Sequence, residues 1–100
     1  MYKKAANTNF SKQITSYENT VAVDFHAAWC PQCIQMSQRL DQVCREANIP
    51  LIRIDVDKEP ELVDEYGIIN VPSLLIFRNG TLKRTVSGIW PKETLKKMLK

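Results

Sequence analysis

Val23-Asp24-Phe25-His26-Ala27-Ala28-Trp29-Cys30-Pro31-Gln32-Cys33 is the stretch of sequence that decides the fold. It joins residues 20–25, whose β-branched and apolar side chains are typical of a buried strand, to a helical pattern that begins at Pro31. Proline suits the first position of a helix, because the N–H group that it lacks has no partner inside the helix there. Two cysteines separated by two residues therefore lie where a buried strand gives way to a helix.

Strand and helix patterns alternate along the rest of the chain. The predicted elements are a weak strand at 2–6, a helix at 8–17, strands at 20–25, 51–56, 73–77 and 82–87, helices at 31–47 and 59–66, and a last helix opened by Pro91. The 31–47 helix carries an apolar stripe of Cys33, Met36, Leu40, Val43, Cys44 and Ala47. Alternation predicts a mostly parallel sheet covered on both faces, and the Asn79-Gly80 hairpin makes it mixed. We expect one α/β domain over residues 1–100.

The composition is that of an ordinary globular protein, with a net charge of +3, 44% hydrophobic residues and 25% charged residues. No apolar run is long enough to span a bilayer, and residues 1–7 lack the apolar stretch of a signal peptide. We therefore expect a cytoplasmic protein with no membrane partner. The lysines near the C-terminus are expected on the wet face of the last helix. Without interleaved aromatic residues they do not indicate nucleic-acid binding.

The position of Cys30 at the start of a helix has a chemical consequence. Unpaired backbone N–H groups and the positive end of the helix dipole stabilise negative charge there, and a thiolate is the form of cysteine that attacks disulfides. Cys33 begins the buried stripe of the same helix. We therefore expect Cys30 to face outward as the nucleophile, and Cys33 to be sheltered and to release a mixed disulfide from Cys30.

A Cys-x-x-Cys pair is also half of a zinc site. Cys44 lies eleven residues beyond Cys33 on the predicted helix, about 16 Å away at the rise of an α-helix, so it cannot share a metal with the pair. His26 is the remaining candidate, which leaves the site one ligand short of a closed tetrahedron. We expect no metal and no cofactor beyond a Cys30–Cys33 disulfide, and we interpret Cys44 as an inert core thiol.

The stretch from Val23 to Cys33 resembles the active-site stretch of the thioredoxin family. Later landmarks follow in order, namely Ile54-Asp55-Val56-Asp57, Tyr66-Gly67-Ile68, Val71-Pro72-Ser73-Leu74-Leu75-Ile76-Phe77, Asn79-Gly80 and Gly88. The resemblance covers about residues 8–99. It implies a thioredoxin fold, with a central mixed sheet of four or five strands flanked by helices on both faces. It also implies reversible thiol–disulfide exchange with protein substrates.

The resemblance assigns roles to further residues. It implies that Pro72 follows a cis peptide bond beside the cysteines, and that Asp24 is a buried carboxylate that moves protons at Cys33. Arg53 stands where the family often has a lysine, and its permanent charge would hold Asp24 ionised if it reaches. Pro31-Gln32 replaces the family's usual Gly-Pro. Because this dipeptide helps set the reduction potential, the direction of electron flow stays open.

The family layout also implies a surface around the sulfur of Cys30. Its predicted members are Trp29, Pro31, Gln32, Ile34, Val71, Pro72, Ile89 and Trp90. Ile34 lies off the buried stripe, and an exposed apolar cluster beside a reactive group indicates a peptide-binding surface. The Val71 backbone offers pairing to an extended substrate segment. For Trp90, simple packing against the last helix is an alternative of equal weight to a place on this surface.

We therefore expect a thiol–disulfide oxidoreductase that works as a protein-disulfide reductase. The expected protein is a monomer that a thioredoxin-reductase-type donor keeps reduced. One alternative is a dedicated redox partner of a single peroxidase or reductase, which the unusual Pro31-Gln32 and Trp90 favour. Another is a binding module without turnover, against which the retention of both cysteines argues.

Overall fold

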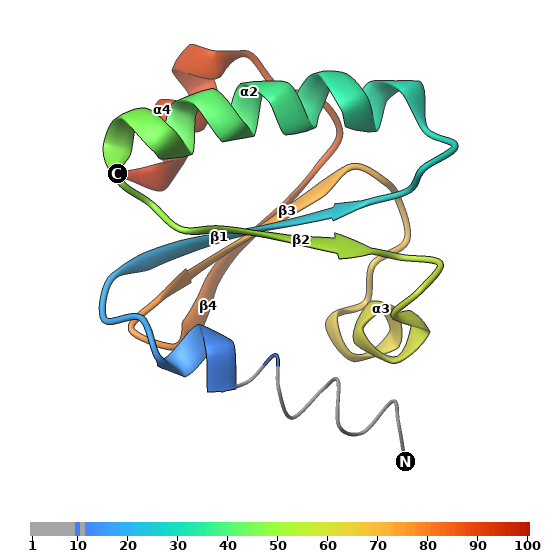
Figure 1. Cartoon of the computed structure of the whole chain (residues 1–100), viewed down its shortest axis with the longest axis horizontal. Helices are drawn as coiled ribbons and strands as arrows, with labels where there is room; N and C mark the ends of the chain where they lie inside the picture. Colours follow the sequence, from blue (N-terminus) through green and yellow to red (C-terminus); the bar gives the residue numbers. More distant parts are fainter. Residues whose placement is uncertain (1–9, 11) are drawn as a thin grey trace.

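The computed structural model describes residue 10 and residues 12–100. The strand predicted at 2–6 lies outside the described residues, and of the helix predicted at 8–17 the stretch 12–15 is helical. The elements that follow are β1 (Thr20–His26), α2 (Pro31–Ala47), β2 (Leu51–Asp55), α3 (Pro60–Tyr66), β3 (Ser73–Arg78), β4 (Thr81–Ser87) and α4 (Lys92–Leu99) (Figure 1). From residue 20 onward, each predicted element is found with bounds that differ by at most one residue.

The sheet is mixed, as expected, but it is not mostly parallel. Within the described residues it has four strands in the order β2-β1-β3-β4. Only the β1–β2 pairing is parallel there, whereas β3 runs antiparallel to both β1 and β4. Helix length explains the difference. The 17 residues of α2 carry the chain about 25 Å back along the sheet, whereas the 7 residues of α3 span only about 10 Å. β3 therefore starts near the end of the sheet where β2 stops, and runs back.

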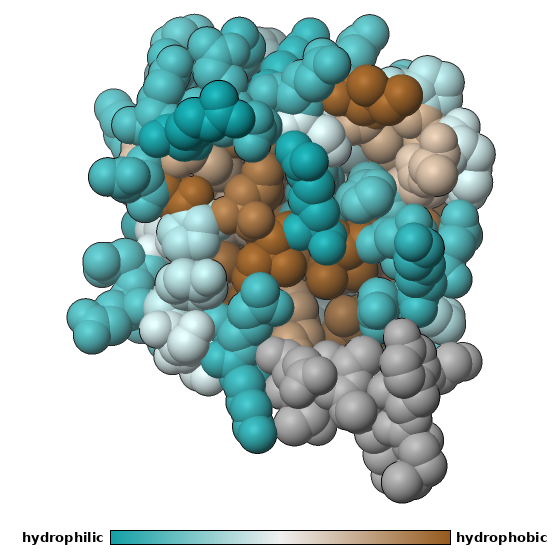
Figure 2. Space-filling model, viewed as in Figure 1, coloured by the Kyte–Doolittle hydropathy of each residue, from teal (hydrophilic) through white to brown (hydrophobic). Residues whose placement is uncertain are grey.

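Helices cover both faces of the sheet. In Figure 1, α2 and α4 lie on one side of it, and α3 and the helical segment at 12–15 lie on the other. Successive residues of a strand point to opposite faces, so Val21, Val23 and Phe25 pack toward α3 while Ala22 packs toward α2 and α4. In the same view, apolar side chains gather between the two helical layers and polar ones cover the outside of α2 (Figure 2). Asp24 shares the face of Ala22 and so points toward α2.

The ends of the elements follow from local residue chemistry. Asn48 ends α2 in a left-handed conformation with φ of 58°, which asparagine tolerates better than most residues. Asn79 and Gly80 both have positive φ, as the predicted two-residue hairpin requires. Ala47 is exposed, contrary to its predicted place on the apolar stripe, because it borders an open groove beside the end of α4. No helix in the described part of the chain is long and apolar enough to cross a membrane.

Candidate active site

Cys30 occupies the predicted position at the start of α2. Its backbone is extended, with φ of −104° and ψ of 108°, and Pro31 follows within the first turn of the helix. The backbone N–H of Cys33 donates to Cys30 Sγ at 3.2 Å. The cap geometry inferred from the sequence is therefore present, while Gln32 is exposed beside it.

Both sulfur-bearing residues are more enclosed than the sequence suggested. Cys30 was expected to face outward, yet only 6% of it is exposed, against 2% of Cys33. Ala27, Val56 and Val71 pack around the pair. The carbonyl oxygen of Val71 lies 3.9 Å from Cys30 Sγ and accepts its S–H. Cys30 is thus recessed between the helix start and the segment before β3.

The bond between Val71 and Pro72 is cis, as the family resemblance implied. Pro72 is buried, and its carbonyl oxygen accepts the N–H of Gly88 at 2.8 Å. This bond holds the loop between β4 and α4 against the segment that contacts Cys30. Ile89, next in that loop, is partly buried against the apolar cluster between the sheet, α2 and α4.

Asp24 is completely buried on the face of β1 that meets α2. Burial raises its pKa, and this outweighs the hydrogen bond from Ser37 and the charges of His26 and Arg53, which lower it. Ser37 Oγ donates to Asp24 Oδ2 at 2.7 Å. Within the described part of the chain, the other carboxylate oxygen, Oδ1, has no hydrogen-bond partner.

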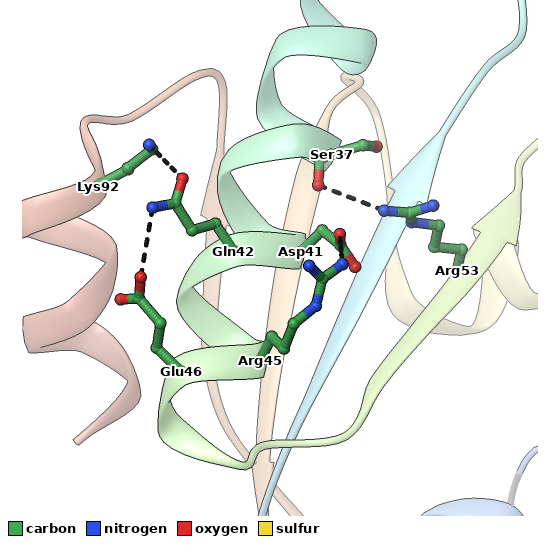
Figure 3. Close-up of polar contacts among 7 residues, drawn as sticks. All are labelled: Ser37, Asp41, Gln42, Arg45, Glu46, Arg53 and Lys92. Carbon is green, nitrogen blue, oxygen red and sulfur yellow. Dashed lines mark hydrogen bonds and ion pairs between the residues drawn. The ribbon is translucent and has the colours of Figure 1, made fainter.

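Arg53 does not pair with Asp24, so the condition under which its charge would hold this carboxylate ionised is not met. The two residues lie opposite each other in the β1–β2 register, but the structure shows no ion pair between them. Arg53 Nη2 instead donates to the backbone carbonyl of Ser37 at 3.3 Å (Figure 3). Its positive charge favours ionised Asp24 only from a distance, so desolvation of the carboxylate prevails.

The thiol of Cys33 needs help to lose its proton. Burial raises its pKa to about 11, and the neighbouring Cys30 and the charge of Asp24 act in the same direction. A thiol with this pKa is almost entirely protonated at neutral pH, so its attack requires a base. Burial also raises the pKa of Cys44 to about 11, and Cys44 is only 2% exposed. No cluster of three or more potential metal ligands occurs among the described residues.

Large apolar side chains stand exposed near the cysteines in the sequence. Trp29 is 67% exposed and Ile34 is 58% exposed, as predicted for Ile34. Trp29 Nε1 donates to Asp57 Oδ2 at 2.9 Å, which ties the ring to the loop after β2. Trp90 is held from two sides, since its Nε1 donates to Ser87 and its carbonyl accepts from Arg39.

Comparison with known proteins gives the family. The family model for thioredoxin matches residues 1–100. The chain belongs to the thioredoxin family. A thioredoxin of Porphyra purpurea is 34% identical over 98 residues, covering 96% of this chain and 92% of the relative, and that of Bacillus subtilis is 32% identical with the same coverage. The structure of a mutant thioredoxin from Halobacterium salinarum superimposes with a TM-score of 0.82 at 29% identity, over 87% of this chain and 77% of that one.

Membership of the thioredoxin family establishes the class of reaction. The protein is a thiol–disulfide oxidoreductase with a thioredoxin fold. Proteins of this family act on other proteins, so its partners include protein substrates.

Two contacts of the site were not predicted from the sequence. Ser37 contacts Asp24, and Asp57 contacts Trp29. Ser37 lies four residues after Cys33, which places both on one face of a helix, and this spacing was an available signal. Asp57 belongs to one of the later family landmarks, but nothing in that stretch indicated its contact with Trp29.

Proposed function

We propose that this thioredoxin-family protein reduces protein disulfides, with Cys30 as the nucleophile and Cys33 as the resolving thiol. The observation that carries the proposal is the unequal setting of the two sulfurs. Cys30 Sγ accepts the backbone N–H of Cys33 at the start of α2 and lies beside the segment at Val71. The pKa of Cys33 is raised to about 11, chiefly by burial, so that Cys33 is held as a thiol until it is needed.

The reaction follows from these settings. The Cys30 thiolate attacks one sulfur of the substrate disulfide, and the other substrate sulfur leaves as a thiolate that takes up a proton. Cys33 then loses its proton to Asp24 and attacks Cys30 Sγ, which releases the second substrate sulfur. Two electrons have passed to the substrate, and a Cys30–Cys33 disulfide remains as the only redox group that the cycle needs.

The exposed apolar side chains fit a role in holding the substrate. Trp29 and Ile34 flank Cys30 in sequence and present flat or branched apolar surface to solvent. The segment at Val71 lies against Cys30, where an extended substrate chain could align with it. Pro31 and Gln32 are exposed in the first turn of α2, directly after Cys30 in the chain.

Continued turnover requires an electron donor. We propose a reductase of the thioredoxin-reductase type, acting on the monomeric protein in the cytoplasm. A reducing compartment supports this cycle, because it keeps substrate thiols reduced after release.

Substitution of each cysteine tests the proposal. In an insulin-reduction assay, Cys30→Ser should lose activity, whereas Cys33→Ser should accumulate a mixed disulfide with the substrate that mass spectrometry detects. Cys44→Ser is the matched control and should retain wild-type turnover, since Cys44 is buried away from the pair. Turnover by Cys30→Ser would refute the assignment. Poor insulin reduction by the wild type, beside fast exchange with one peroxidase or reductase, would instead identify a dedicated partner.

A further inference from the structure

Asp24 has no direct access to solvent. Its exposed fraction is 0%, and it lies between the sheet and α2. A buried carboxylate that takes a proton in each cycle must also return it, so a chain of polar groups must connect it to water. The hydrogen bond that the structure shows to its side chain comes from the Ser37 hydroxyl, at 2.7 Å from Oδ2.

Ser37 also reaches solvent on its other side. A groove of about 430 Å³ opens between α2 and the edge of the sheet, and its walls include Cys33, Ser37, His26 and Arg53 but not Asp24. Cys33 and Ser37 are four residues apart on α2, so both side chains project from one face of the helix into the same groove. Ser37 is therefore the group that touches both the buried carboxylate and the space beside Cys33.

We propose that Ser37 is a positioning residue for the resolving step, because its hydroxyl connects the carboxylate of Asp24 to the Cys33 thiol and to the groove. This inference rests on the proposed function, in which Cys33 releases the mixed disulfide. A hydroxyl suits the task, since it donates one hydrogen bond and accepts others at the same time.

The proton balance is simple. Cys33 gives up its proton to Ser37 Oγ, directly or through a water in the groove that passes it on, while Ser37 passes its own hydroxyl proton to Asp24 Oδ2. The Cys33 thiolate then forms the bond to Cys30 Sγ, and the bond from Cys30 to the substrate sulfur breaks. Before the next cycle the proton returns from Asp24 through Ser37 to water in the groove.

The surroundings of Asp24 are consistent with this role. Besides burial, the groups that shift the pKa of Asp24 are Ser37 on α2, His26 on β1 and Arg53 on β2, while its register partner on β3 is the apolar Leu74. The charge of Asp24 in turn raises the pKa of Cys33 and Cys44 on α2. Arg53 donates to the Ser37 carbonyl, which fixes the residue that bears the hydroxyl. Ser37 is therefore contacted from both strands that border the groove, by Asp24 on β1 and by Arg53 on β2.

The test separates the two chemical steps in one experiment. Reduced protein is mixed with 5,5′-dithiobis(2-nitrobenzoate) in a stopped-flow instrument. Attack by Cys30 releases the first coloured thiolate, and resolution by Cys33 releases the second. Ser37→Ala is compared with Ser37→Thr, which keeps the hydroxyl, and with Gln38→Ala, which removes an exposed side chain from the same groove. Asp24→Asn and the Asp24→Asn/Ser37→Ala double variant complete the set.

The substitution of Ser37 should change only the second phase, in which Cys33 releases the second coloured thiolate. At pH 7, Ser37→Ala should slow it about tenfold, the loss typical of a hydrogen bond to a charged group, and leave the first phase unchanged. The deficit should shrink as pH rises and hydroxide removes the proton directly. Ser37→Thr should restore the rate to within about twofold, Gln38→Ala should match the wild type, and the double variant should be no slower than Asp24→Asn.

Other outcomes overturn the inference without touching the proposed function. A wild-type second phase in Ser37→Ala at every pH would show that Ser37 carries no proton. Equal slowing of both phases would show a general structural role. Additive effects in the double variant would place Ser37 and Asp24 on separate routes. Absence of both phases from the wild type would instead refute the proposed function itself.

Discussion

Cys30 and Cys33 influence each other in a way that suits a two-step reaction. The raised pKa of Cys33 comes first from burial and then from Cys30, whose sulfur takes the hydrogen bond of the Cys33 thiol and whose charge opposes a second thiolate. When Cys30 enters a mixed disulfide, that charge disappears. One cause of the high pKa of Cys33 is thereby removed at the step in which Cys33 must ionise. Under the proposed function, Cys33 is therefore harder to ionise in the free protein than after Cys30 has captured a substrate.

Ile34 provides a residue-scale test of substrate binding. Its side chain is 58% exposed on the first turn of α2, directly after Cys33. Ile34→Lys should lower kcat/KM for insulin several-fold, because a charged amine would sit where apolar substrate surface is buried. Reduction of oxidised glutathione, which is too small to cover the patch, should change less than twofold.

Gln35→Lys is the matched control, since it adds the same charge at the next exposed position. It should leave insulin reduction near the wild-type rate. Equal losses of insulin and glutathione reduction in Ile34→Lys would contradict a substrate surface at this position.

The sequence placed some residues of the site and missed others for a physical reason. Cys30 and Cys33 follow from local patterns, because the start of a helix after a buried strand is visible in neighbouring residues, whereas the role of Asp24 comes from the family resemblance. The bonds from Ser37 to Asp24 and from Trp29 to Asp57 join residues 13 and 28 positions apart. Such contacts depend on how elements pack, so only the structure reveals them.

At the scale of elements, α2 carries most of the functional geometry. Its first residues hold the cysteines, its inner face bears Ser37, and its far half is fastened to α4. Gln42 Oε1 accepts a hydrogen bond from Lys92 on α4, and Gln42 also donates to Glu46 one turn along α2 (Figure 3). These contacts join the far half of α2 to α4, while both cysteines lie at its opposite end.

Local patterns predicted the elements better than they predicted their directions. Periodicity identified α2 with the correct bounds, because a long buried stripe shows clearly in sequence. The direction of β3 depends instead on whether α3 is long enough to return the chain across the sheet. The alternation of strands and helices says nothing about whether each helix is long enough to return the chain. The prediction of a mostly parallel sheet was wrong for that reason.

The end of α2 offers a test of element stability. Asn48 adopts φ of 58° and ψ of 40°, a conformation that costs most residues roughly 1–2 kcal/mol. Asn48→Val should lower the free energy of unfolding in urea by about that amount, whereas Asn48→Gly should leave it unchanged or slightly higher. Both variants should reduce insulin normally, since the cap lies at the end of α2 remote from the cysteines. A Val variant as stable as the wild type would show that the turn relaxes.

At the scale of the whole molecule, the burial of Asp24 serves the proposed function but lowers the stability of the fold. It occupies a fully buried position between the sheet and α2, among side chains that are otherwise mostly apolar. Its Oδ1 has no partner in the described part of the chain, and a buried polar atom of this kind is costly to desolvate. An apolar residue would pack there without that cost, yet it could not serve as the base that we propose for Cys33.

The pH dependence of unfolding measures this cost. Because the pKa of Asp24 is raised in the folded protein above its ordinary value of 3.8, chiefly by burial, the folded state binds the proton more tightly than the unfolded state. The contribution of Asp24 to stability is therefore complete below that ordinary value and is lost as pH rises through the raised pKa. Asp24→Asn cannot ionise, so its free energy of unfolding should not share this loss.

The two proteins should consequently diverge in urea unfolding between acidic and neutral pH. The free energy of unfolding of Asp24→Asn should increase relative to that of the wild type as pH rises. The difference should become constant once Asp24 is ionised in both the folded and the unfolded wild type. A difference between Asp24→Asn and wild type that stays flat with pH would mean that folding does not shift the titration of Asp24. In that case its burial would carry no proton-binding consequence, and the assignment of this carboxylate as the base for Cys33 would lose its physical support.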